Sequence, residues 1–260
     1  MNPHLPEVRH WSTQMTHTMI ALAAFSILSM TTAANVFAQR SFSRTYPARG
    51  NIHVELRNLF GTITVEAWGR NDIKVYATME SPAAHIVPEF KGDGLLIDVV
   101  RDNRGRDDVG DVNFTISVPV NSSVDLMTKR GQITVRGVQG AQVYARVTTE
   151  GDIELTGIRA TNVMAENTMG NILFDAELLQ GGTYVLKSTQ GDINLRLNAS
   201  SGFNLTATAP RTRNINLGGF QGRGVFEYLS NNRKVVGRVG NGGASLTTTN
   251  QLGSIVFSLR

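Results

Sequence analysis

Residues 148–158 read TTEGDIELTGI, and the five-residue phrase at their centre, GDIEL from Gly151, decides the fold. The phrase is a glycine, a polar residue, an isoleucine, any residue and an apolar residue. The same phrase returns as GTITV at Gly61, GQITV at Gly131, GNILF at Gly170, GDINL at Gly191 and GSIVF at Gly253, while RNINL at Arg213 lacks only the glycine. The consecutive starts at 131, 151, 170 and 191 are 20, 19 and 21 residues apart. A fixed period near this length is typical of a solenoid with one supersecondary unit per repeat.

Each position of the phrase has a physical reason. Glycine opens a turn because it accepts positive φ without a Cβ clash, and a polar residue after it suits a turn corner. The next residues alternate between apolar and polar, which is the period of a strand with one buried face. The sequence therefore predicts these inward-facing pairs: Ile63 and Val65, Ile133 and Val135, Ile153 and Leu155, Ile172 and Phe174, Ile193 and Leu195, Ile255 and Phe257.

A second alternating strand precedes each glycine. Counting back seven, five and three residues predicts further inward sets: Val124, Leu126 and Thr128; Val163, Ala165 and Asn167; Tyr184, Leu186 and Ser188; Leu246, Thr248 and Asn250. The position three before the glycine is Thr, Asn or Ser, and Thr148 fits it as well. Stacking would align these residues in a ladder that hydrogen-bonds with itself and with the turn backbone.

One repeat conflicts with this register, because it would bury Arg146. An unpaired buried guanidinium is costly. We therefore expect a shift of one residue, accommodated by a β-bulge. The shift turns Val143, Ala145 and Val147 inward instead.

Each unit is thus a strand, a turn, a strand and a loop, and it cannot bury its own apolar face, so neighbours must stack. We predict an all-β fold, a parallel β-helix or β-solenoid with rungs of about 20 residues stacked about 4.8 Å apart. Ile133, Ile153, Ile172 and Ile193 should form one column. A β-sandwich also has short alternating strands, but it does not require one phrase at constant spacing.

The repeat is less regular in two places. The repeat spacing becomes irregular over residues 79–110, where Pro82, Pro88 and the segment 101–111 are expected to be loops. Over residues 210–243 the repeat unit is longer than elsewhere. We predict one continuous array over residues 39–260. Within it, residues 39–120 form less regular N-terminal rungs, which can be a separate sub-unit or cap, and residues 121–260 form regular repeats.

The N-terminal segment indicates export. Residues 19–30 are an unbroken run of apolar or small residues, and Val36, Phe37 and Ala38 form a small-x-small cleavage pattern. Twelve residues are too few to span a bilayer, which needs about 20, but they suit the core of a secretory signal peptide. We predict a signal-peptide helix over residues 1–38, with a retained anchor or a buried helix as alternatives. The mature chain is then exported to the periplasm, the cell surface or the medium, and it does not span the membrane.

Composition narrows the chemistry. The chain has 260 residues, is 41% hydrophobic and contains no cysteine, which excludes disulfides, thiolate metal sites and a cysteine nucleophile. The formal net charge is only +4, and the basic residues are scattered without interleaved aromatics, which argues against nucleic acid as a partner.

Four segments carry a family resemblance: NLFGTITVEAWGRNDIKVYATME (58–80), TTEGDIELTGI (148–158), STQGDINLRLNASSGFNLTATA (188–209) and GASLTTTNQLGSIVFSLR (243–260). They resemble the bacterial putative adhesin family of β-strand-repeat domains, which is related to adhesin head domains. The resemblance covers most of residues 48–260. It implies an exported or envelope-associated β-helical domain that is not an enzyme, and it brings no catalytic residues with it.

Enzymatic candidates are nevertheless readable, since β-helices include polysaccharide lyases and hydrolases. Asp152 and Asp192 recur at one repeat position about two rungs apart, a spacing compatible with an inverting carboxylate pair. Aspartate after glycine is, however, the ordinary choice for a turn, and we favour that role. Asp107, Asp108 and Asp111 could hold calcium, but arginines are mixed with them and the spacing of an EF-hand loop is absent.

The remaining candidates are weaker. His53 and His85 are the two histidines beyond the signal segment, and they lack the spacing of a zinc site. We interpret Tyr144, Tyr184 and Phe203 as core or rung-stacking residues rather than as a sugar platform. We therefore assign no catalytic, cofactor or metal residues, and no cofactor.

The functional hypothesis is a secreted or envelope-associated, non-enzymatic, adhesin-like or structural protein. Its partner would be an envelope or surface component, a glycan or a protein. The alternatives are a β-helical carbohydrate-active enzyme and a regulatory envelope domain.

Overall fold

The computed structural model describes residues 40–48, 51–81 and 84–260. The predicted signal peptide lies outside these residues. The predicted all-β class is confirmed, since the described chain is folded into two large sheets with one short helix, α2 (Val99–Asp102), and one 3₁₀ turn, η1 (Gly218–Phe220). No helix in the described ranges is long and apolar enough to cross a membrane.

Ten strands form sheet A. In spatial order they are β1 (Arg40–Pro47), β4 (Asp72–Met79), β7 (Val112–Pro119), β3 (Ile63–Trp68), β9 (Ile133–Arg136), β11 (Ile153–Ile158), β13 (Ile172–Ala176), β15 (Ile193–Leu197), β21 (Ile255–Leu259) and β17 (Ile215–Asn216).

Eleven strands form sheet B. In spatial order they are β18 (Gly224–Leu229), β19 (Lys234–Val239), β16 (Phe203–Thr208), β20 (Ala244–Asn250), β14 (Thr183–Gln190), β12 (Asn162–Met169), β10 (Gln142–Glu150), β8 (Ser123–Arg130), β2 (His53–Arg57), β6 (Gly94–Asp98) and β5 (Glu89–Lys91).

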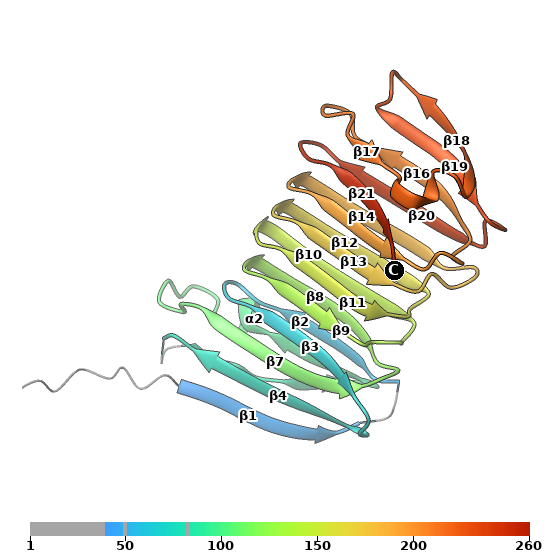
Figure 1. Cartoon of the computed structure of the whole chain (residues 1–260). Coiled ribbons are helices and arrows are strands. Elements are labelled where there is room, and N and C mark those ends of the chain that lie inside the picture. Colours follow the sequence, from blue (N-terminus) through green and yellow to red (C-terminus); the bar gives the residue numbers. More distant parts are fainter. Residues whose placement is uncertain (1–39, 49–50, 82–83) are drawn as a thin grey trace, which may run out of the picture. The chain divides into compact units, whose positions relative to one another are not determined.

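The chain alternates between the two sheets from β8 to β15, with each glycine turn linking a strand of sheet B to the next strand of sheet A (Figure 1). Neighbouring repeats pair in parallel and in register, as Ile153 does with Ile133 on one side and Ile172 on the other. The predicted column is present and longer than expected: it runs Ile63, Ile133, Ile153, Ile172, Ile193, Ile255, Ile215.

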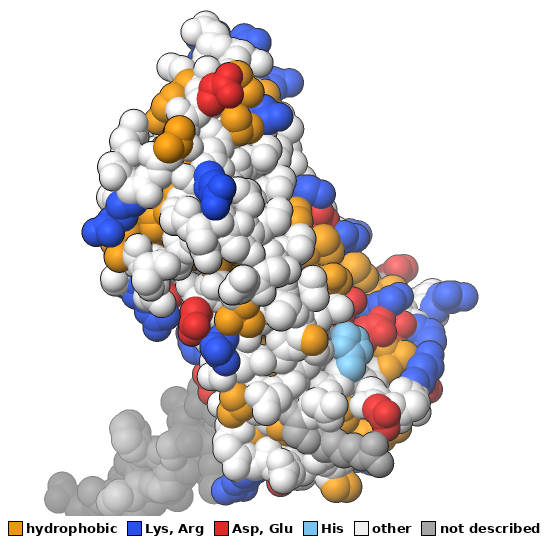
Figure 2. Space-filling view, turned by 90° about the vertical axis from the view of Figure 1, so that its right-hand side faces the viewer, with side chains coloured by type: hydrophobic (Ala, Val, Ile, Leu, Met, Phe, Trp, Pro, Cys, Tyr) orange, Lys and Arg blue, Asp and Glu red, His pale blue; other side chains and the backbone are white. Residues whose placement is uncertain are grey.

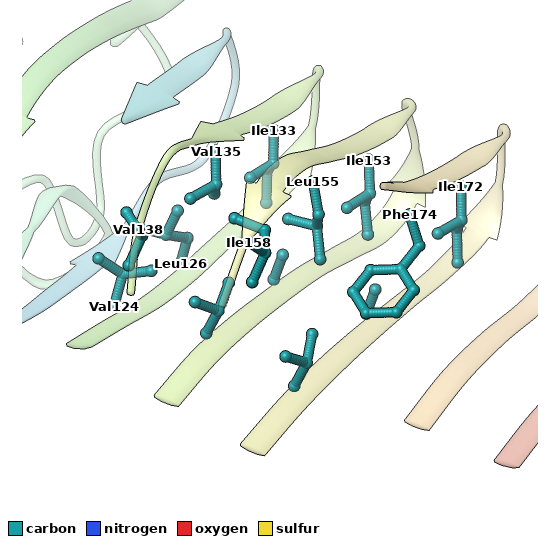
Figure 3. Close-up of a cluster of buried hydrophobic side chains, with 14 of the residues drawn as sticks. Val124, Leu126, Ile133, Val135, Val138, Ile153, Leu155, Ile158, Ile172 and Phe174 are labelled. Carbon is teal, nitrogen blue, oxygen red and sulfur yellow. The ribbon is translucent and has the colours of Figure 1, made fainter. Parts of the chain in front are cut away.

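A single hydrophobic core lies between the sheets. Figure 3 shows Ile133, Ile153 and Ile172 side by side, facing residues such as Leu126 from the opposite sheet. All the residues predicted to face inward in both strands of the repeats are buried. The alternation in the sequence is therefore the burial pattern of the structure.

The predicted shift around Arg146 is confirmed. Val143, Ala145 and Val147 are buried, and the pairing of β10 with both neighbours shifts register between Val147 and Glu150. The expectation for Thr148 is wrong: the bulge places Val147 opposite Thr128 and Asn167, so Thr148 faces solvent.

The predicted corner ladder is confirmed in its burial and in its bonds to the turn backbone, but no hydrogen bond joins Thr128, Asn167, Ser188 and Asn250, which are all buried, to one another. Asn167, Ser188 and Asn250 each donate a hydrogen bond to the carbonyl of the turn glycine in the preceding repeat, at 3.3, 3.5 and 2.7 Å. Asn58 holds the same position before Gly61 and donates to the Phe60 carbonyl, a member of the ladder that the sequence analysis did not include. These bonds satisfy turn carbonyls that stacking removes from water.

The spatial order departs from the chain order at both ends. In sheet B, β2 lies between β6 and β8, and in sheet A, β3 lies between β7 and β9. Likewise, β20 lies between β14 and β16, and β21 lies between β15 and β17. Among the described strands, antiparallel pairs occur only at these ends, in β1–β4–β7, β5–β6 and β16–β19–β18. Atypical ends of this kind are how repeat stacks close their cores.

The irregular segments were predicted in part. Residues 101–111 are mostly turn and coil, but α2 takes in Arg101 and Asp102. The stretched segment 210–243 contains η1 and the hairpin β18–β19.

Candidate functional site

Asp152 and Asp192 are engaged in the turns. Asp152 Oδ1 accepts from the backbone N–H of Asn171 at 2.6 Å, Asn171 Oδ1 accepts from Asp192 N–H at 2.8 Å, and Asp192 Oδ1 accepts from Ser254 N–H at 2.8 Å. The two carboxylates belong to one series of side-chain to backbone hydrogen bonds, in which Asn171 lies between them. Each carboxylate accepts a bond from the next turn and so holds that turn in place. This arrangement is what the turn interpretation of the sequence requires.

The other sequence candidates lie apart. Asp108 is exposed and pairs loosely with Arg106 at 3.5 Å, and Asp111 donates its backbone N–H to Glu80 Oε2. His85 exchanges backbone hydrogen bonds with the Asn103 side chain, while His53 lies on β2. Among the described residues, no group of His, Asp and Glu side chains is arranged to hold a metal ion.

The three aromatic candidates differ in burial. Tyr184 and Phe203 are fully buried core residues, as expected. Tyr184 Oη accepts from Leu179 N–H at 2.7 Å and donates to the Ala160 carbonyl at 2.9 Å. Tyr144 is not a core residue, because it lies on the outer face of β10 with its ring in an open hollow.

That hollow adjoins a second one on the regular repeats, and we call the two together the outer groove. It lies on the solvent face of sheet B and consists of two adjoining hollows of about 320 and 430 Å³ that share Arg146. The first is lined by Arg57, Asp125, Met127, Tyr144, Ala145, Arg146 and Met164, and the second by Arg146, Val147, Thr148, Glu166, Asn167, Thr168, Lys187 and Thr189.

The register of sheet B places these side chains in rows across the strands. One row runs Asp125, Tyr144, Met164 and Val185, and the next runs Met127, Arg146, Glu166 and Lys187. The outer groove therefore has an apolar row beside a charged row. Because every side chain stands on a paired strand, the groove is held rigid by the sheet.

Glu166 is the centre of the charged row. Its carboxylate contacts Arg146 at 2.8 Å and Lys187 at 2.9 Å. Partial burial alone would raise the pKa of Glu166, but the hydrogen bond from Lys187, with the charges of Lys187 and Arg146, outweighs burial and lowers that pKa. Glu166 thus stays ionised and both cations are held in fixed positions.

Asp125 has the opposite electrostatic environment. Burial raises the pKa of Asp125, and the neighbouring charge of Glu55 raises it further, while His53, Arg57 and Arg146 offset only part of this effect. A carboxylate beside a second carboxylate in a half-buried hollow is ready to accept a cationic or hydrogen-bond-donating group.

The outer groove has the features of a binding surface rather than of a catalytic centre. Its charged row is ion-paired across the strands through Glu166, and the hollow is shallow and open, with an apolar row to contact a ligand. The sequence analysis missed it because outward positions of a strand carry no periodic signal. The available clue was the run of Tyr144, Met164 and Val185 at a position that is polar in other repeats, as at Asp125 and Thr247.

Part of the chain matches a known family model. Residues 100–210 match the family model described as Toastrack DUF4097, which confirms the family resemblance. None of the curated proteins matches this chain.

Several solved structures show weak similarity to this chain. One is a putative cell adhesion protein from Clostridium sporogenes ATCC 15579, at 12% identity and a TM-score of 0.48, covering 85% of this chain and 100% of its own. A putative adhesin from Bacteroides fragilis NCTC 9343 has 12% identity and a TM-score of 0.36, covering 85% and 98%. A putative lipid binding protein from Parabacteroides distasonis ATCC 8503 has 8% identity and a TM-score of 0.33, covering 85% and 97%. Similarities this low carry no argument about function.

Proposed function

Because residues 100–210 carry a Toastrack DUF4097 domain, we propose that this chain is an exported, non-enzymatic, adhesin-like protein that acts by surface contact. In this proposal residues 1–38 are a signal peptide, and residues 39–260 form one β-solenoid that works outside the cytoplasm. Its partner is a component of the cell envelope or of another surface, a glycan or a protein.

The outer groove is the observation that supports this proposal best. It presents the apolar row of Tyr144 and Met164 beside the ion-paired row of Arg146, Glu166 and Lys187. A ligand lying across the strands would meet equivalent positions of successive repeats. Extended chains are well suited to such a surface, because they offer the same kind of group at intervals.

The turn aspartates support the non-enzymatic part of the proposal. Asp152 and Asp192 each use a carboxylate oxygen to hold the neighbouring turn. A general acid or base must face its substrate, whereas these two face the backbone of their own stack.

The proposal is tested by binding assays with cell-wall glycans, host matrix and envelope proteins. Tyr144→Ala together with Met164→Ala should weaken binding at least about tenfold, because buried aromatic contacts dominate interface energies. Tyr76→Ala is the matched control, since Tyr76 is a partly exposed tyrosine on sheet A. Binding that is unchanged by the groove variant, or equally reduced by the control, would exclude the outer groove as the contact surface.

A further inference from the structure

The positive charge of this protein is concentrated at one end of the stack. Residues 203–254, which we call the basic cap, include β16 to β20. They contain six basic residues against one acidic residue, Glu227, a net charge of +5 in a chain whose total is +4: Arg211, Arg213, Arg223, Arg233, Lys234 and Arg238. The rest of the chain is therefore close to neutral.

The cations of the basic cap lack acidic partners, unlike most basic residues of residues 121–202. There, Arg136 pairs with Glu66, Arg159 with Glu177 and Arg196 with Asp175. Within the described residues, none of the six cations of the cap forms an ion pair, and five of them are exposed. Their charge is thus free to act on something outside the molecule.

The cations of the basic cap lie at the two ends of the hairpin β18–β19. The loop after β16 is tied to the hairpin turn by a hydrogen bond from Ala209 N–H to the Arg233 carbonyl at 2.8 Å. This contact brings Arg211 and Arg213 towards Arg233. At the other end of the hairpin, Arg238 lies opposite Val225.

Exposed apolar side chains lie among the charges. Val225 is 81% exposed and Tyr228 is 43% exposed. Both are on β18, an edge strand of sheet B, where Val225 shares the face of Arg238 and Tyr228 points to the other face. The opposite sheet ends in β17, which has two residues, so it covers β18 incompletely. Figure 2 shows this upper end of the molecule, where Lys and Arg and hydrophobic side chains gather and acidic ones are sparse.

We propose that the basic cap docks on the surface of an anionic phospholipid bilayer. Each Lys or Arg near such a surface contributes through attraction to the lipid headgroups. An aliphatic and an aromatic side chain on the same edge fit the boundary between headgroups and acyl chains. A soluble polyanion would use the cations but would leave Val225 and Tyr228 in water, so the combination favours the membrane.

The consequence is a defined orientation. The protein would stand with the hairpin β18–β19 on the membrane, and the regular repeats with the outer groove would project away from it. This surface is separate from the outer groove, so it does not depend on the ligand proposed above.

The test uses protein purified from the exporting cell and sedimented with vesicles of phosphatidylcholine, with or without phosphatidylglycerol. Arg211→Gln, Arg223→Gln and Arg233→Gln together should lower partitioning onto the anionic vesicles about a hundredfold, from the contribution expected per charge. Arg136→Gln, Arg159→Gln and Arg196→Gln together change the net charge equally but remove paired cations, and should leave partitioning nearly unchanged.

A second pair of variants separates membrane docking from simple charge attraction. Val225→Ser should lower partitioning about tenfold, while Val87→Ser, which alters a valine that is 50% exposed outside the basic cap, should not. Three results would overturn the proposal: no preference for anionic vesicles, equal losses in the two arginine triples, or no effect of Val225→Ser. Circular dichroism of each variant establishes that the fold is retained.

Discussion

The Asp152 carboxylate accepts a hydrogen bond from the backbone N–H of Asn171, 2.6 Å away in the next repeat. The bond belongs to a series of hydrogen bonds that continues through Asn171 and Asp192 to Ser254. The polar residue after each turn glycine therefore joins neighbouring repeats, in addition to shaping its own turn.

This series of hydrogen bonds predicts that Asp152→Ala destabilises the protein by about 1–2 kcal/mol, because the Asn171 N–H loses a charged acceptor. Asp152→Asn keeps an acceptor oxygen and should cost less than half as much. Urea unfolding followed by circular dichroism measures both. Equal costs for the two variants would show that the hydrogen bond is unimportant.

The same residues decide between the adhesin-like protein and the carbohydrate-active enzyme. Asp152→Asn with Asp192→Asn should leave any polysaccharide turnover of the preparation unchanged, because both side chains serve the turns. A screen of polysaccharide substrates measures this. Turnover by the wild type that the double variant abolishes would establish the enzyme instead.

Gly191→Ala should destabilise the protein by about 3 kcal/mol or more. Gly191 has φ of +117°, and a Cβ there would clash with the carbonyl oxygen of Gly170 in the neighbouring repeat. Gly69→Ala is the control, because a Cβ at Gly69 meets nothing within 4 Å. Thermal unfolding should separate the two, and similar melting temperatures would contradict the close stacking of the turns.

Ile153 lies in the middle of the isoleucine column, between Ile133 and Ile172. Ile153→Val should cost about 1 kcal/mol, as removal of a buried methylene does. Ile153→Asp should cost several kcal/mol, because it buries an unpaired charge. If Ile153→Asp folded with near wild-type stability in urea, the position could not be a core position.

Glu166 and Asp125 should have opposite effects on the pH dependence of stability. The folded pKa of Glu166 is lowered, so its ionised form stabilises the protein above the unfolded value near 4.5, and this contribution is lost as pH falls through the folded pKa. Glu166→Gln should therefore be less stable than wild type at pH 7, with the difference disappearing in acid.

The folded pKa of Asp125 is raised, so its ionised form is a cost at neutral pH that protonation relieves. Asp125→Asn should be more stable than wild type at pH 7, and this difference should also disappear below the unfolded value near 3.8. Urea unfolding at several pH values gives both curves. Differences of the same sign in the two variants would contradict the electrostatic picture of the outer groove.

Local chemistry was enough to predict the strands of the repeats and their inward faces. The glycine turns, the alternation after them and even the shifted register around Arg146 could be derived, because each depends on local sterics and on the cost of burying a charge. The isoleucine column follows from these, since units of equal length bring equivalent residues to the same place. The role of the turn aspartates was predictable for the same reason.

The strand order at the ends of the stack, the outer groove and the basic cap could be seen only in the folded structure. No local property of GSIVF at Gly253 says that it packs against the repeat of Gly191, with β16 and β17 placed beyond it. Such an order arises from closing the core against water, which is a property of the whole chain. Likewise, Tyr144 and Met164 are distant in sequence, and pairing in register across β10 and β12 is what brings them to one face. The cations of the basic cap lie in turns, in loops and on β19, and only the folding of the hairpin and its neighbouring loop places them at one end of the stack.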